Sequence, residues 1–115
     1  MSPRKPIVER DPHGKALNEP GAKADAGKVM GALLGDFSRA LWQVAEVGTY
    51  GAKKYTRGGW QSVPQGPERY RDALWRHLLE SNQSDLDKDT ELRHLAHAAW
   101  NILAILELDA RGQQT

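Results

Sequence analysis

Apolar residues recur at every third or fourth position along residues 36–55, which is the spacing of an amphipathic helix. The residues on this spacing are Phe37, Ala40, Leu41, Val44 and Val47. Asp36 stands directly before them and belongs to the residue types that cap helix N-termini. The pattern predicts a first helix that starts behind Asp36 and ends near Tyr55.

A second stretch with the same spacing covers residues 67–81. Its repeating positions are Tyr70, Ala73, Leu74, His77 and Leu78. Pro67 suits the first turn of such a helix, where its missing N–H costs nothing. The preceding residues 56–66 contain Gly58-Gly59 and Pro64, which break helices and strands alike, so we expect a loop there.

The longest helical pattern covers residues 90–110, which contain neither Gly nor Pro. Asp89 or Thr90 is the expected N-cap, and Gly112 follows the expected end. One stripe of this helix is apolar, and we expect it to face the main core. The stripe consists of Leu92, Leu95, Ala99, Leu103 and Leu106.

The pattern contains no convincing strand, so the predicted fold is all-α, a small bundle of three to four helices. Residues 1–30 are rich in Pro, Gly, Lys and Asp without apolar periodicity, and we expect an extended, flexible N-terminal arm or lid. Residues 31–110 form the expected helical catalytic domain. Residues 81–90 are an acidic linker, and residues 111–115 a tail.

Two faces of the third predicted helix need partners, which is more than a lone three-helix domain can readily cover. A homo-oligomer is therefore expected. Trp42, Trp75 and Trp100 all lie on predicted helices, and we interpret them as core or subunit-interface residues, because aromatic side chains dominate both settings.

Composition narrows the classes of protein. The chain has 115 residues, no cysteine and a formal net charge of +1, which excludes thiol chemistry and argues against direct binding of duplex nucleic acid. Polar residues interrupt every apolar run, so neither a membrane span nor a secretory signal is predicted. We expect a cytoplasmic protein.

Three polar residues of the third predicted helix share one face. At about 100° per residue, His94, His97 and Asn101 fall within a sector of roughly 60°, well away from the apolar stripe. This arrangement predicts that a polar group of another element meets them. Ordinary surface histidines on an amphipathic helix are the alternative interpretation.

The other two predicted helices offer ligands of the same kind. His77 and Glu80 are neighbours on the second helix, and Glu46 lies on the first. If the three faces converge, their imidazoles and carboxylates could hold a divalent metal or transfer protons. The alternative for both glutamates is a solvated helix face.

Cations gather where the first predicted helix ends. Lys53, Lys54 and Arg57 lie beside the glycine-rich loop, a grouping that suits phosphate. They also suit a helix C-terminus, where cations offset the macrodipole. The run GAKADAGK in the arm has no Walker spacing, so it predicts no P-loop, but it could fold over a ligand as a lid.

Several motifs in order make the chain similar to a known family. The runs KADAGK, FSRALWQVAEVGTYGAKKYTRGGWQSV, RYRDALWRHLL and HLAHAAWNILA resemble the dATP/dGTP diphosphohydrolase family of phages and prophages, a group of MazG-like enzymes. The resemblance covers roughly residues 21–108. It implies an all-α nucleotide pyrophosphohydrolase that uses Mg²⁺ or Mn²⁺ and cleaves a deoxynucleoside triphosphate to monophosphate and pyrophosphate. If a phage encodes the chain, it would act in the host cytoplasm.

The family motifs carry over to Gly51, Lys53, Tyr55, Trp60, Arg76, His77, His94, His97 and Asn101. Two positions depart from the pattern: relatives often have glycine–glutamate and serine–glycine pairs where this chain has Ser84-Asp85 and Thr90-Glu91. Asp85 keeps a carboxylate at the first of them.

Motifs and local chemistry together suggest three groups of site residues. The expected metal ligands are Glu46, Glu80 and Asp85. The expected catalytic residues are His77, His94, His97 and Asn101. The expected substrate-binding residues are Lys53, Lys54, Tyr55, Trp60 and Arg76.

Two other functions fit parts of the sequence. The histidine-rich helices suggest an HD-type metal phosphohydrolase, although the His-Asp dipeptide of that class is missing. MazG-type enzymes carry paired ExxE and ExxD acids on their helices, and this chain has only Glu46 on its first predicted helix. This shortage suggests a non-catalytic helical module that binds a nucleotide or a protein.

Overall fold

The computed structural model describes residues 8–112, and residues 1–7 of the predicted arm and 113–115 of the predicted tail lie outside that range. The chain divides into two compact units, Met1–Asp36 and Phe37–Thr115. A 3₁₀ helix, η1 (Gly31–Phe37), spans the division.

Turns make up the first unit between residues 8 and 30. The buried carboxylate of Asp11 organises them by accepting hydrogen bonds from the backbone N–H groups of His13, Lys15 and Lys23, at 2.9, 3.1 and 3.1 Å. These bonds, those from Lys15 and Lys23 above all, hold the pKa of Asp11 below its ordinary value. One carboxylate thus links residues twelve positions apart.

Three α-helices form the second unit, and the predicted all-α class is confirmed. They are α1 (Ser38–Lys54), α2 (Gly66–Glu80) and α3 (His94–Ala110), with the 3₁₀ helix η2 (Gly59–Ser62) between the first two. Within residues 8–112 no strand forms, and the one extended pairing is an isolated bridge between Leu86 and Arg93.

The predicted cap of the first helix is wrong. Asp36 lies inside η1, and α1 begins after Phe37 without a side-chain cap. Helical turns already run through residues 31–37, so the backbone groups before α1 belong to a 3₁₀ turn and no free first turn remains for Asp36 to cap. The end of the helix is confirmed, because Tyr55 is its C-cap.

The start of the third helix is also wrong: α3 begins at His94, not at residue 90. Asp87 is the reason. Its Oδ1 accepts hydrogen bonds from the N–H groups of Asp89 and Thr90 and from the Thr90 hydroxyl, which holds these residues in a loop. Glu91 then takes a left-handed backbone conformation with φ 60°, which no helix continues through.

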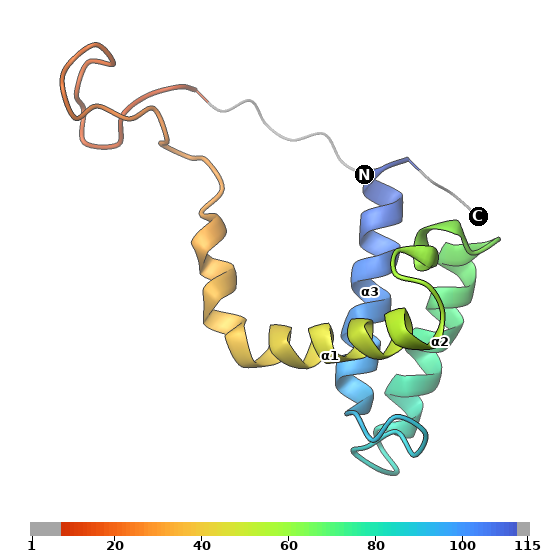
Figure 1. Ribbon diagram of the computed structural model, residues 1–115. Coiled ribbons are helices and arrows are strands. Elements are labelled where there is room, and N and C mark those ends of the chain that lie inside the picture. Colours follow the sequence, from red (N-terminus) through yellow and green to blue (C-terminus); the bar gives the residue numbers. More distant parts are fainter. Residues whose placement is uncertain (1–7, 113–115) are drawn as a thin grey trace. The chain divides into compact units, whose positions relative to one another are not determined.

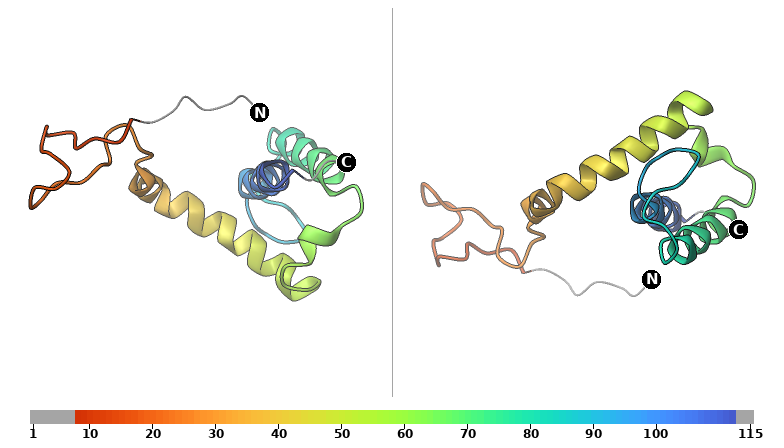
Figure 2. Two further views of the ribbon diagram at one scale, coloured as in Figure 1. Left: turned by 90° about the horizontal axis from the view of Figure 1, so that it is seen from above. Right: turned by 90° about the horizontal axis from the view of Figure 1, so that it is seen from below.

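The helices pack as an antiparallel pair with a third helix across it. Figure 1 shows α2 and α3 side by side, and the views along this pair in Figure 2 show α1 running across it, in contact with α3. Trp100 of α3 lies at the centre of this packing. It meets Trp60 and Tyr70 edge-on, with ring centroids 5.9 and 5.6 Å away. It also faces Gly48 of α1, where an added Cβ would stand 3.2 Å from its indole nitrogen.

The buried face of α3 differs from the prediction. The residues that are buried are His94, Ala96, His97, Ala98, Asn101, Ala104 and Leu108. Of the apolar stripe expected in the core, Leu95, Leu103 and Leu106 remain 48%, 47% and 57% exposed. The polar face packs on α2 because α2 supplies polar partners, which leaves the leucines without cover in a single chain.

The tryptophans divide in the same way. Trp100 packs inside the helical unit as predicted, whereas Trp42 and Trp75 are 72% and 57% exposed and take no part in the core of one chain. Their predicted place in a subunit interface stays a prediction. None of the helices that residues 8–112 form has the length and apolar character to cross a bilayer.

Candidate active site

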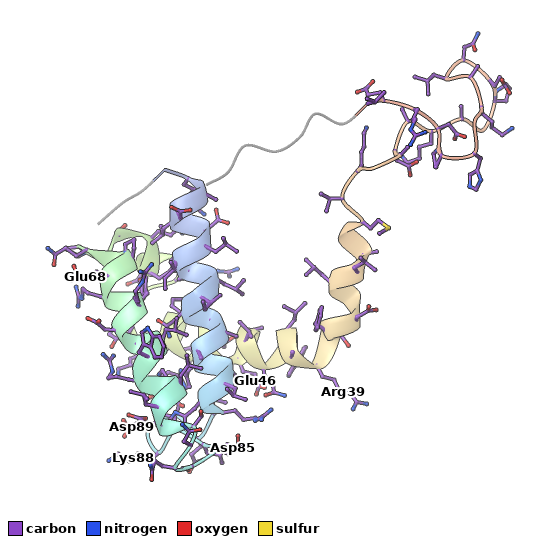
Figure 3. All side chains as sticks on the ribbon, turned by 180° about the vertical axis from the view of Figure 1, so that it is seen from behind. Arg39, Glu46, Glu68, Asp85, Lys88 and Asp89 are labelled. Carbon is purple, nitrogen blue, oxygen red and sulfur yellow. The ribbon has the colours of Figure 1, made fainter. Side chains whose placement is uncertain are left out.

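Polar side chains of α2 and α3 meet where the last turn of α2 faces the first turns of α3. Residues 81–93 connect these two helix ends, and Figure 3 shows Asp85, Lys88 and Asp89 on that connection. α2 contributes His77 and Glu80, and α3 contributes His94 and His97. The polar faces of the second and third helices thus meet, whereas Glu46 of the first helix does not join this group.

The three histidines contact one another directly. Nδ1 of His77 lies 3.0 Å from Nδ1 of His94, so one ring must donate a proton to the other when no cation is bound. The rings of His77 and His97 stack almost parallel, with centroids 4.3 Å apart and 6° between their planes. His94 and His97 are buried, so these contacts hold the rings in position inside the helical unit.

Thr90 and Asp87 extend the cluster into the loop. The Thr90 Oγ1 lies 2.7 Å from Nε2 of His97, 3.2 Å from Asp87 Oδ1 and 3.2 Å from the backbone nitrogen of Leu92. All three bonds form together if the hydroxyl donates to Asp87 and accepts from Leu92 and from a protonated Nε2 of His97. This network favours the tautomer of His97 whose Nδ1 is free to accept a proton.

Sequence reasoning missed Asp87 and treated Thr90 only as a helix cap. The signal was present in the run of acidic residues SDLDKDT, in which Asp87 precedes Thr90 by three positions, a spacing that suits a side chain bonding to nearby backbone N–H groups. Only the loop conformation singles out Asp87 among three aspartates.

The surroundings keep the imidazoles neutral. Burial lowers the pKa of His77, and the nearby His97 lowers it further. Burial likewise lowers the pKa of His97, against the opposing charge of Asp87. Burial alone would raise the pKa of Asp87, but the hydrogen bonds from Thr90 and Asp89 outweigh it and keep the pKa below its ordinary value. Near pH 7 the cluster therefore combines the neutral imidazoles of His77 and His97 with the carboxylate of Asp87.

Four ligand atoms could hold a cation. One nitrogen or carboxylate oxygen each from His77, Glu80, Asp87 and His94 all lie within 4.8 Å of one another. Oε2 of Glu80 is 3.6 Å from Nδ1 of His94. Of the three predicted metal ligands, only Glu80 belongs to this group.

Glu46 and Asp85 lie elsewhere. Glu46, on α1 in Figure 3, lines a small pocket. The other lining residues are Gln43, Leu86, Glu91, Leu92, Arg93 and Ala96. Asp85 is exposed, and its Oδ1 forms an ion pair with Nε of Arg93 at 3.1 Å. Arg93 therefore contacts Asp85 and borders the pocket of Glu46.

Asn101 lies one turn beyond His97 and is buried. Its Nδ2 donates to the carbonyl oxygen of His97 at 2.9 Å. Thr90, not Asn101, therefore holds the imidazole of His97. The predicted catalytic role of Asn101 stays a prediction.

The predicted substrate-binding residues occupy two settings. Lys53, Lys54, Tyr55 and Arg76 are exposed, with Lys54 Nζ 5.3 Å from the ring centre of Tyr55. Trp60 instead packs on Trp100, and the guanidinium of Arg111 lies 5.8 Å from its ring. These contacts give Trp60 a structural role, and its predicted part in substrate binding remains a prediction.

Comparison with known proteins now places the chain. A sequence model of the family described as dATP/dGTP diphosphohydrolase, N-terminal, matches residues 18–115. The chain belongs to the dATP/dGTP diphosphohydrolase family. A relative named dATP/dGTP diphosphohydrolase, from Salmonella phage PMBT28, is 40% identical over 89 residues. The match covers 76% of this chain and 29% of that relative's length. No solved structure matches.

The backbone of Glu91 is unusual at a position where the family resemblance leads us to expect glycine. Its φ of 60° lies in the left-handed region that favours glycine. The loop keeps the conformation that places Asp87 and Thr90 beside His97, although a side chain is present at Glu91.

Proposed function

We propose that this chain hydrolyses the purine deoxynucleoside triphosphates dATP and dGTP to monophosphate and pyrophosphate in a reaction that needs a divalent metal ion. The observation that carries the proposal is the cluster of imidazoles and carboxylates between α2 and α3, present in a chain of this family. The activity in the name of the phage relative supports the proposal, although the chain spans 29% of that relative's length.

Mg²⁺ or Mn²⁺ is the proposed cofactor, and the cluster has the chemistry to hold one. Its two carboxylates come from Glu80 and Asp87 and its two imidazoles from His77 and His94. A divalent ion there would polarise the phosphoryl oxygens and make a bound water more acidic. Glu46 and Asp85 remain proposed ligands of lower rank, since neither belongs to the four-residue group.

The histidines supply the proton transfer of the proposed reaction. A histidine that acts as a general base must be unprotonated near pH 7 and within hydrogen-bond reach of the water it activates. The lowered pKa values of His77 and His97 meet the first condition. The hydrogen bond that Nε2 of His97 donates to the Thr90 hydroxyl fixes the ring whose Nδ1 would accept the proton.

Cations outside the cluster would bind the phosphates. Arg76 is exposed beside His77 on α2, and Lys53 and Lys54 are exposed at the end of α1. Fixed positive charges of this kind stabilise the negative charge that develops on a leaving pyrophosphate. Tyr55 and Trp60 are the proposed aromatic contacts for the nucleoside.

A homo-oligomer is part of the proposal. The exposed apolar residues of α3, namely Leu95, Ile102, Leu103 and Leu106, share a helix with the cluster and point away from α2. An apolar face of this kind is typical of a subunit interface. We propose that a second copy of the chain covers it.

Product analysis tests the proposed function. The purified chain is incubated with each deoxynucleoside and ribonucleoside triphosphate and Mg²⁺ or Mn²⁺, and the products are separated by ion exchange. Monophosphate and pyrophosphate from dATP or dGTP are expected. Orthophosphate would support an HD-type phosphohydrolase instead, and binding without turnover a non-catalytic module.

Paired variants show which carboxylates take part. Glu80→Gln is expected to abolish turnover while the helical circular dichroism stays unchanged, because Glu80 is 55% exposed and contributes little to packing. Glu46→Gln is the comparison. If only Glu46→Gln were inactive, the reaction would belong to the pocket on α1 and not to the cluster.

A further inference from the structure

We infer that His77, Glu80, Asp87 and His94 form a binding site for a first-row transition-metal ion, which the site holds in preference to Mg²⁺. The inference deepens the proposed function and depends on it for the role of the ion. Its basis is the positions and the chemistry of four side chains from three segments: α2, the loop before α3, and α3 itself.

The spacing of the ligand atoms matches a coordination sphere. Two ligands at about 2.1 Å from a metal and at right angles to each other lie about 3.0 Å apart. Nδ1 of His77 and Nδ1 of His94 are separated by 3.0 Å. Oε2 of Glu80 lies 3.6 Å from the same nitrogen of His94, and the whole group fits within 4.8 Å. Small rotations of exposed Glu80 bring it into range.

The contact between the two nitrogens favours a cation over the empty state. Without a cation, one Nδ1 must carry a proton directed at the other. A metal ion takes the lone pairs of both nitrogens at once and leaves both Nε2 atoms protonated. Histidine, through a neutral imidazole nitrogen, is the commonest metal ligand in proteins.

The donor set determines which ions fit. Mg²⁺ selects oxygen ligands and keeps several of its waters, whereas imidazole suits Fe²⁺, Ni²⁺, Cu²⁺ and Zn²⁺. Among the first-row ions, affinity for a site with nitrogen and oxygen ligands rises from Mn²⁺ through Fe²⁺ and Co²⁺, so Mn²⁺ is the most demanding probe of the preference over Mg²⁺. Two of the four ligands here are imidazole nitrogens from His77 and His94. The carboxylates of Glu80 and Asp87 balance the charge of a divalent ion and keep hard oxygen donors in the sphere.

The loop holds its ligand in place before any ion binds. The hydrogen bonds from Asp89 and Thr90 all end on Oδ1 of Asp87, so Oδ2 can face a cation. His94 is 4% exposed on its side chain and Glu80 55%, so protein encloses one side of the site and the other is open to a substrate. A site open on one side leaves coordination positions for phosphate oxygens and water.

Metal binding without substrate tests the inference. The full chain, freed of metal by a chelator, is titrated with Mn²⁺, and free Mn²⁺ is followed by electron paramagnetic resonance. One site per chain is expected, and a large excess of Mg²⁺ is needed to displace the ion. Glu80→Gln and Asp87→Asn are expected to weaken Mn²⁺ binding at least 10-fold.

A matched control is available in the same loop. Asp89→Asn removes a carboxylate two positions from Asp87 that does not belong to the ligand group. This variant is expected to bind Mn²⁺ like the unaltered chain. Co²⁺ provides a second readout, because its visible absorption changes when nitrogen ligands replace water. Circular dichroism of each variant confirms that the helices are intact.

Three results would overturn the inference: no Mn²⁺ binding, equal affinity for Mn²⁺ and Mg²⁺, or Glu80→Gln and Asp87→Asn proteins that bind Mn²⁺ unchanged. Turnover of dATP measured on the same samples separates this outcome from failure of the proposed function. Turnover with no Mn²⁺ preference removes only the site assignment. Tight Mn²⁺ binding without turnover removes the activity and keeps the site.

Discussion

On α3 the polar face is buried and the apolar face is exposed, the reverse of an ordinary amphipathic helix. On one face His94, His97 and Asn101 are buried, and on the other Leu95, Leu103 and Leu106 are exposed. A hydrophobic scale applied to this helix alone puts the leucines inside and the histidines outside.

The difference shows that partners decide burial on this helix. Burial of a polar group costs free energy unless hydrogen bonds replace water. His77, Thr90 and the helix backbone provide those bonds, so the polar face can be buried within one chain. Among residues 37–112 of the helical unit no element covers the leucine face, and we propose a second copy for that role. Variants on either face test this explanation.

The largest expected effect is on the polar face. Asp87→Asn keeps an acceptor for the N–H groups of Asp89 and Thr90 but removes the negative charge. We expect turnover of dATP to fall at least 100-fold, a loss of about 2.7 kcal/mol in transition-state stabilisation. Quantified pyrophosphate release measures it, with Asp89→Asn as control. Full activity of Asp87→Asn would remove the cluster from the reaction.

The leucine face is tested by charge. Leu103→Asp puts a carboxylate at an exposed position of one chain, so the helices should form normally. If a second copy covers this face, the variant becomes monomeric, because a buried unpaired charge is costly. Light scattering after size-exclusion chromatography measures the mass, and Glu107→Asp on the same helix serves as control. A monomeric unaltered chain would contradict the proposal.

Thr90→Val tests the link between the loop and the polar face. It removes the hydroxyl that joins Asp87 to His97 but keeps the shape of the side chain. A lost partner of this kind lowers activity about 10-fold or more. We expect a lower kcat and an altered pH profile of turnover, both restored by Thr90→Ser. An unchanged pH profile would give Thr90 a purely structural role.

Acid should lower the free energy of unfolding through the histidines of the polar face. The pKa values of His77 and His97 are lowered in the folded chain, so the unfolded chain binds more protons below its own histidine pKa, about 6.5. The stability is thus fully present above that pH and falls as the pH drops through it. Thermal unfolding between pH 7.5 and 5.5, in chelator, measures the slope. His97→Asn should flatten this slope.

The smallest effect concerns the backbone before α3. Glu91→Gly relieves a left-handed conformation and should raise the free energy of unfolding by about 0.5–1 kcal/mol. Lys88→Gly in the same loop should lower it, because Lys88 has no positive φ and glycine only adds freedom to the unfolded chain. Urea unfolding of both variants measures the difference. Destabilisation by Glu91→Gly would show that its side chain outweighs the strain.

The sequence predicted much of the fold from local rules. The 67–81 helix matches α2, and the end of α3 lies before Gly112, whose φ is 79°. Glycine and proline punctuation explains this success, since their backbone preferences act without distant contacts. The starts of α1 and α3 were wrong, because a 3₁₀ turn and the Asp87 loop compete with helix there.

The candidate site followed the same division. Helical spacing alone places His94, His97 and Asn101 on one face, and this face predicts a polar partner on another element. His77 is that partner for the two histidines. Asp87 could not be chosen from Asp85, Asp87 and Asp89, because only the loop conformation directs its carboxylate to the histidines.

The sequence by itself therefore determined the helical class, the helix that carries the polar face and the family, because periodicity and motif order are properties of the chain alone. The tertiary structure alone decided which face of α3 is buried and which carboxylates join the histidines. Both depend on distant residues, since burial of a polar group is favourable only where another segment supplies its hydrogen bonds.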